Sequence, residues 1–217
     1  PGAPLFQMLG AFFAMFAASA DKIALMVNYL SVFSSAFTVL FMFWSLTLLL
    51  RKIIGQTKEV TTAQNTMILG SSLIASLSFT FSDSFWYNAV EAEVYAMASF
   101  LIALLFWLGL RWEQEMETPR GNKWLLLISL VIGLSFGVHF MALLTFPAIG
   151  FLYFFKKYKT VTVKSFILAN VVIVAILLFI FKLLLPFTLG FFGKTEIFMV
   201  NELGLPFNSG TIFAFLF

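Results

Sequence analysis

Long uncharged hydrophobic stretches alternate with short polar segments along the whole chain. A membrane-spanning helix needs about 20 mainly apolar residues, because a helix rises about 1.5 Å per residue through a hydrocarbon layer about 30 Å thick. The pattern therefore predicts an all-α, polytopic integral membrane protein, with residues 1–217 forming a single transmembrane domain. We expect spans near 23–50, 60–82, 94–110, 124–138, 140–155 and 165–185, and the start of another at 211–217.

The stretch 124–155 carries no formal charge but is too long for one span. As a single helix it would extend about 48 Å, well beyond the hydrocarbon layer. Gly133, Gly137 and His139 lie near its middle. We therefore expect two shorter helices that meet near His139. The later span at 165–185 is expected to end at Pro186, because proline disrupts a helix interior.

Two features concern the ends of the chain. The apolar segment 5–18 is too short to span, so we expect an interfacial helix on the outer face. The chain begins at Pro1 without a signal-peptide pattern and ends within an apolar run. We expect it to be a fragment of a larger membrane protein, truncated at both ends.

Composition excludes several classes of protein. The chain is 61% hydrophobic and 11% charged, whereas about a quarter of the residues of a soluble domain are charged. It has no cysteine, which excludes disulfides and thiolate chemistry, and a single histidine, which excludes a site with several histidine ligands within this chain. The small net charge of +3 gives no support for nucleic-acid binding.

The basic residues predict an orientation. If 124–155 forms two helices, most lysines and arginines fall in loops on one side, which the positive-inside rule makes cytoplasmic. The acidic segment around residue 91 and His139 then share the outer face. The basic residues on the predicted cytoplasmic side are Arg51, Lys52, Lys58, Arg111, Arg120, Lys123, Lys156, Lys157, Lys159 and Lys164, and the others are Lys22, Lys182 and Lys194.

Three acids, Asp83, Glu91 and Glu93, lie between two hydrophobic runs without a basic residue among them. Ionisable groups near the hydrocarbon are costly and often mark a site. On a helix Glu91 and Glu93 would point about 200° apart, so they converge only where the chain is not helical. Asp83, Tyr87 and Glu91 have helical spacing, and Tyr95 continues it. The acids suit a general base or a cation site, or else a solvated loop in which Asp83 caps a helix.

His139 is the other candidate. Its polar ring needs a partner in or beside the membrane, either at a functional site or as part of the structure. The glycines at 133 and 137 predict close helix packing.

Three segments together resemble a known family. They are Pro1–Gly10, the stretch from Ser78 to Tyr95, and Gly133–His139. They resemble the bacterial membrane family related to protein O-mannosyltransferases, common in Bacteroidetes, whose members look like GT-C glycosyltransferases. The resemblance implies a GT-C-like helical bundle that moves a sugar from a polyprenyl-phosphate donor to a protein or glycan acceptor. It also implies the bacterial cytoplasmic (inner) membrane, with the active site on the periplasmic side.

The resemblance also implies roles for residues. The family's expected general base precedes the Pro-Gly-Ala-Pro segment, so this fragment alone is expected to be inactive. The cofactor stays open, with a divalent cation as the candidate, and the alternatives are a transporter or a non-catalytic assembly subunit. The predicted catalytic residues are Glu91, Glu93 and His139, and the predicted substrate contacts are Asp83, Trp86, Tyr87, Tyr95, Pro1, Gly2 and Pro4.

Overall fold

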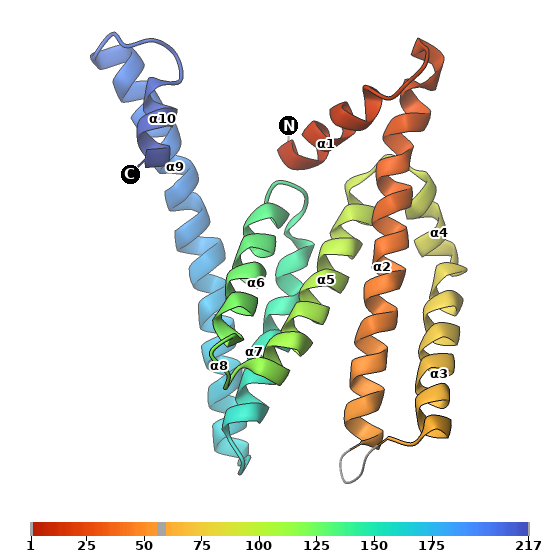
Figure 1. Cartoon of the computed structure of the whole chain (residues 1–217). Helices are drawn as coiled ribbons and strands as arrows, with labels where there is room; N and C mark the ends of the chain where they lie inside the picture. The colour runs from red at the N-terminus through yellow and green to blue at the C-terminus, as the bar shows by residue number, and fades with distance from the viewer. Residues whose placement is uncertain (1, 56–59, 217) are drawn as a thin grey trace. The chain divides into compact units, whose positions relative to one another are not determined.

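The computed structural model describes residues 2–55 and 60–216, which form helices and turns without a strand (Figure 1). This confirms the predicted all-α class. Four helical segments of the described chain are long and apolar enough to cross a membrane: Ala20–Ile54, Val94–Glu115, Phe140–Lys157 and Val163–Glu202. The helices are α1 (Pro4–Ala14), α2 (Ile23–Ile54), α3 (Thr62–Thr80), α4 (Asp83–Val90), α5 (Val94–Glu115), α6 (Gly121–Ser135), α7 (Phe146–Lys157), α8 (Val163–Phe179), α9 (Leu185–Ile197) and α10 (Ser209–Leu216).

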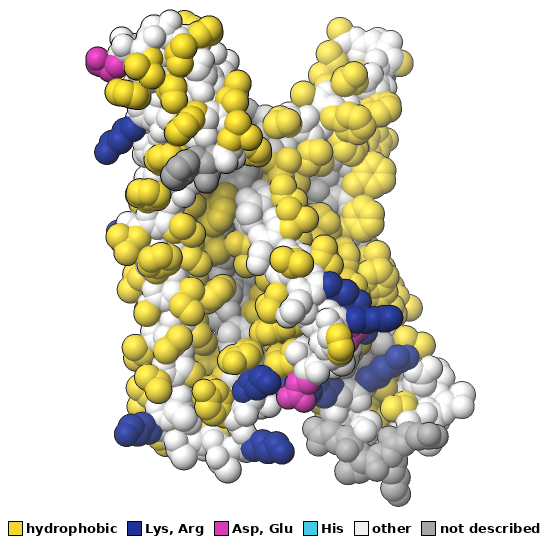
Figure 2. Space-filling view, turned by 60° about the vertical axis from the view of Figure 1, so that its left-hand side comes forward, with side chains coloured by type: hydrophobic (Ala, Val, Ile, Leu, Met, Phe, Trp, Pro, Cys, Tyr) yellow, Lys and Arg dark blue, Asp and Glu magenta, His cyan; other side chains and the backbone are white. Residues whose placement is uncertain are grey.

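The chain divides into two compact units, Pro1–Lys159 and Thr160–Phe217. In the first unit, α5 is the central helix and packs against α2, α6 and α7. Its buried side chains Leu101, Leu105 and Leu108 form the middle of the hydrophobic core. Large apolar side chains still cover most of the face seen in Figure 2, as expected of a surface that meets lipid.

Helices α2 and α3 pack against each other, and both bury small polar side chains. Small residues let two membrane helices approach closely, and their hydroxyls can bond to the carbonyl one turn earlier. Ser34 Oγ donates to Leu30 O at 2.7 Å, and Thr38 Oγ1 donates to Ser34 O at 2.9 Å. The buried small polar residues are Ser31, Ser34, Ser35, Thr38 and Ser45 on α2, and Ser72 and Ser76 on α3.

The uncharged stretch 124–155 forms two helical segments separated by a break. Helix α6 ends at Ser135, and the chain resumes with the short 3₁₀ helix η2 (Phe140–Thr145), which leads into α7. His139 is extended at the start of η2, with φ −162° and ψ 140°. The break therefore falls at the histidine.

The N-terminal helix differs from the one expected at 5–18. Helix α1 is shorter, and its Phe6 and Gly10 are buried. Phe6 joins the core of the first unit, and α1 packs against α2. Phe12 and Met15 remain exposed. The helix is thus held by packing on one side, which the largely apolar sequence of this segment did not reveal.

The helical backbone does not stop at Pro186, where the sequence predicted the end of a span. Helical backbone continues from Val163 to Glu202. Pro186 lies in the first turn of α9, directly after the π-helical segment η3 (Ile180–Leu184). A wide π turn changes the hydrogen-bond pairing at the position where proline lacks its N–H, so the helix can pass through it.

The second unit ends in a helical hairpin. After the π-helical segment η4 (Phe198–Glu202), α10 folds back against α9. Asn208 N and Thr211 N donate to the carboxylate of Glu196 at 2.6 and 2.8 Å. This carboxylate satisfies amides at the start of α10, which is the usual function of a helix cap.

Candidate functional site

Three segments of the first unit meet at one end of its helices. They are the start of α1, the turn between α4 and α5, and the turn between α6 and η2. These segments surround a shallow pocket of about 460 Å³. We call this end, marked by Gly2, Glu93 and His139, the pocket end. The full lining is Gly2, Ala3, Phe6, Gln7, Ala92, Glu93, Val94, Val138 and His139.

The first turn of α1 is fixed to the α6–η2 turn by its backbone. Leu5 N and Phe6 N donate to Gly137 O at 2.8 and 3.3 Å. The first amides of a helix have no acceptor within it, so this carbonyl satisfies two of them. A Cβ added at Gly137 would lie 2.7 Å from Leu5 Cβ, so only glycine permits this approach.

The two glycines predicted to allow close helix packing therefore differ from each other. Gly137 makes a close contact, but it does so with α1. A Cβ at Gly133 would meet no described atom within 4 Å outside its own helix backbone.

The α4–α5 turn decides which acid faces the pocket. The helix stops at Val90, and both Glu91 and Glu93 have extended backbones. Glu93 N donates to Glu91 O at 2.8 Å, which closes a tight turn. Both acids are exposed, and of the two only Glu93 belongs to the pocket lining. The turn also interrupts the helical spacing that the sequence suggested from Asp83 to Tyr95.

The carboxylate of Glu93 stands at the start of α5 without capping that helix. Because the side chain makes no capping hydrogen bond, its oxygens can accept one from a ligand in the pocket.

His139 is half-buried and held through one ring nitrogen. Met141 N donates to its Nδ1 at 3.1 Å. The proton of the neutral imidazole is therefore on Nε2. The ring of Tyr95 lies beside the imidazole, with centroids 5.6 Å apart. Tyr95 thus contacts the site through His139, although it is outside the pocket lining.

The remaining predicted residues that the structure describes are not part of the pocket lining. Asp83 occupies the first turn of α4, as an acid favoured by the helix dipole does. Trp86 and Tyr87 are exposed, and the Trp86 ring stacks on Phe81 at a centroid distance of 6.4 Å. Pro4 begins α1 next to the pocket. Pro1 lies outside the described residues.

Sequence reasoning missed Gln7, which lines the pocket from α1. The sequence did contain a signal for it, since Gln7 is the one polar side chain in the apolar run 5–18.

Whether the site binds a metal ion stays open. Within residues 2–55 and 60–216, no group of three or more His, Asp or Glu side chains is arranged to hold a metal ion.

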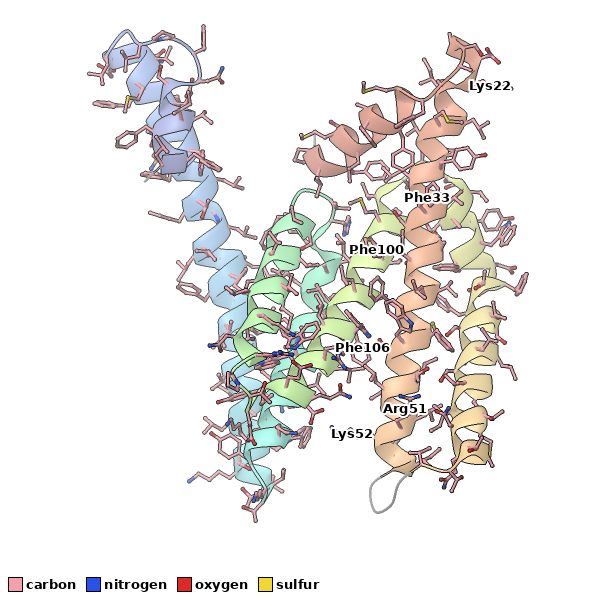
Figure 3. The ribbon with its side chains drawn as sticks, in the orientation of Figure 1. Lys22, Phe33, Arg51, Lys52, Phe100 and Phe106 are labelled. Carbon is pink, nitrogen blue, oxygen red and sulfur yellow. The ribbon has the colours of Figure 1, made fainter. Side chains whose placement is uncertain are left out.

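The opposite end of the first unit is rich in lysine and arginine, and Figure 3 labels Arg51 and Lys52 there. We call it the basic end. Glu113 is buried in the last turn of α5. It pairs with Lys52 Nζ at 2.9 Å and with Lys156 Nζ at 3.4 Å. The carboxylate therefore links α5 to both α2 and α7.

Comparison with known proteins gives one match. Residues 1–162 match the family described as the protein O-mannosyl-transferase TMEM260 N-terminal domain. This range contains all three segments of the pocket and ends close to the boundary between the two compact units. No curated protein matches the chain, and no solved structure does.

Proposed function

Because the chain belongs to the protein O-mannosyl-transferase TMEM260 N-terminal domain family, we propose that it forms part of a GT-C-like membrane glycosyltransferase. The donor would be a sugar linked to a polyprenyl phosphate, and the acceptor a protein hydroxyl. The observation that supports this most is the convergence of Gly2, Glu93 and His139 on one pocket from three distant segments.

Glu93 is the residue we assign to the acceptor. A hydroxyl becomes a better nucleophile when a carboxylate accepts its proton. In the proposed reaction the acceptor oxygen forms a bond to the anomeric carbon, and the bond from that carbon to the phosphate oxygen breaks. The hydroxyl proton passes to a carboxylate, and Glu93 is placed to receive it or to orient the hydroxyl.

His139 is the residue we assign to the leaving group. The departing polyprenyl phosphate retains the electron pair of the broken bond and needs hydrogen-bond donors. Nδ1 already accepts from Met141, so Nε2–H is the ring donor that can reach a ligand. Tyr95 limits the tilt of the ring and so helps to aim this donor.

The charge distribution supports an outer-face site. The pocket end is acidic, whereas the basic end carries Arg51, Lys52, Arg111, Lys123 and Lys156. The positive-inside rule places the basic end in the cytoplasm. We therefore propose that the pocket opens on the outer face, the periplasmic side of a bacterial inner membrane.

The test compares two neighbouring carboxylates in the full-length protein in its membrane. Glu93→Gln should lower sugar transfer from a polyprenyl-phosphate donor at least tenfold, the low end of what an acid–base group contributes. Glu91→Gln is the matched control, because it removes the same charge from the same turn, and it should change the rate less than about twofold. A normal rate in Glu93→Gln, with normal expression, would contradict the assignment.

A further inference from the structure

A second pocket lies at the basic end, between α2, α5 and α6. Its volume is about 370 Å³. Three tryptophan rings form one wall, with centroids 5.5 Å apart for Trp44 and Trp107 and 6.0 Å apart for Trp107 and Trp124. We call it the tryptophan pocket. Its lining is Trp44, Thr47, Leu48, Trp107, Arg111 and Trp124.

One cation, Arg111, lines the tryptophan pocket, and a second, Lys123, lies over the ring of the lining residue Trp124. The Arg111 guanidinium lies 5.2 Å from the Trp124 ring centroid, and Lys123 Nζ lies 4.6 Å from it. Both cations share one carboxylate, because Arg111 Nη2 and Lys123 Nζ lie 3.0 and 3.6 Å from oxygens of Glu115. One acid between two bases leaves one positive charge in excess. The side chain of Lys123 is 49% exposed, so it remains accessible.

Along the helix axis the pocket is first apolar and then charged, as a lipid is from its acyl chain to its headgroup. Leu48 and Trp107 offer an apolar surface on helices long enough to span, and the charges follow at the polar end. Tryptophan is favoured at the headgroup level, and basic pockets between helices on the cytoplasmic side suit anionic headgroups.

We propose that the tryptophan pocket binds an anionic phospholipid. An acyl chain lies against Trp44, Leu48 and Trp107, and the phosphate meets Arg111 and Lys123. A soluble phosphate would leave the apolar wall unfilled, and a zwitterionic lipid would bring its own cation towards the two bases. Glu115 competes with the phosphate for both cations, so this carboxylate sets the affinity.

The test titrates lipid into the purified protein in neutral detergent and follows the thermal midpoint, since a ligand that binds the folded state raises it. Dioleoyl phosphatidylglycerol should stabilise the wild type more than dioleoyl phosphatidylcholine. Arg111→Gln should weaken the apparent affinity for phosphatidylglycerol about tenfold, through loss of a charge-assisted hydrogen bond. Glu115→Gln should strengthen it severalfold, because it releases both cations. Its amide oxygen can still accept the hydrogen bond that Trp124 Nε1 donates to Glu115 Oε2 at 3.0 Å.

Two variants control for net charge at the same end. Lys159→Gln removes an exposed lysine and Glu117→Gln removes an exposed acid, and each should change the affinity less than about twofold. If Glu117→Gln strengthens binding as much as Glu115→Gln, the effect is general charge and the proposal is wrong.

Further outcomes would also reject the site. Equal stabilisation by phosphatidylcholine, or competition by glycerol phosphate, which lacks acyl chains, would each contradict it. If Arg111→Gln does not fold, the opposite-signed effect expected for Glu115→Gln still decides. None of these measurements depends on sugar transfer.

Discussion

The imidazole of His139 lies beside the phenol ring of Tyr95, with centroids 5.6 Å apart and ring planes inclined at 49°. Tyr95 belongs to the first turn of α5, and His139 begins η2. The contact therefore joins the turn that carries Glu93 to the turn that carries the histidine. Together with the bond from Met141 N to Nδ1, it restricts the ring on two sides.

The first prediction separates the structural role of His139 from its proposed chemistry. An asparagine oxygen can replace Nδ1 as the acceptor for Met141 N, but it does not reproduce Nε2–H. His139→Asn should therefore fold normally and weaken use of the polyprenyl-phosphate donor about ten- to a hundredfold, the worth of one charge-assisted hydrogen bond. His139→Ala should lose the cap as well, at about 1 kcal/mol.

Two measurements on the purified variants check this prediction, the thermal midpoint and the dependence of rate on donor concentration. Normal donor dependence in His139→Asn would remove the histidine from the mechanism. A lower midpoint in His139→Ala would then show a structural role alone.

The second prediction concerns the attachment of α1. Gly137→Ala would force a Cβ against Leu5 Cβ and disturb the bonds from Leu5 N and Phe6 N to Gly137 O. Overpacking of this kind costs about 1–3 kcal/mol. We expect a lower thermal midpoint and faster proteolysis near the start of α1.

Gly133→Ala is the matched control for Gly137→Ala. It adds the same methyl group to the same segment, where nothing described lies within 4 Å. Alanine favours a helix over glycine by up to about 1 kcal/mol, so the midpoint should stay or rise. Equal destabilisation by both substitutions would show that the contact with Leu5 does not hold α1.

The third prediction concerns the buried carboxylate of Glu113. Glu113→Gln removes the charge that Lys52 and Lys156 share and should destabilise the protein by about 1–3 kcal/mol, less than a fully buried pair because the lysines can reach water. Glu117→Gln removes the same charge from an exposed pair with Lys157 and should cost at most about 1 kcal/mol. Thermal unfolding of the two variants in detergent checks the difference, and equal midpoints would contradict it.

The fourth prediction concerns orientation. The chain has no cysteine, so an introduced one gives a unique label. Asn88→Cys, next to the pocket end, should react with an impermeant thiol reagent added outside sealed cells. Thr118→Cys, in the turn between α5 and α6 at the basic end, should react only after the membrane is opened. Labelling of Thr118→Cys in sealed cells would reverse the orientation.

Local patterns in the sequence were enough for the class of the protein. Uncharged apolar runs of sufficient length predict membrane helices whatever their neighbours are, because hydrocarbon requires every backbone polar group to be paired within the segment. The break near His139 followed from length alone, since one helix over 124–155 would exceed the membrane. The same reasoning identified an acidic segment between spans.

The tertiary structure decided which residues form a site. Glu91 and Glu93 are equivalent in sequence, and only the tight turn between α4 and α5 directs Glu93 to the pocket. The start of α1 joins them because Gly137 offers a carbonyl and has no side chain. The burial of Glu113 was not predictable from its local sequence, because it depends on Lys52 and Lys156, which lie far away in the chain. Hydropathy describes how a segment meets lipid, whereas a pocket or an ion pair depends on which segments meet one another.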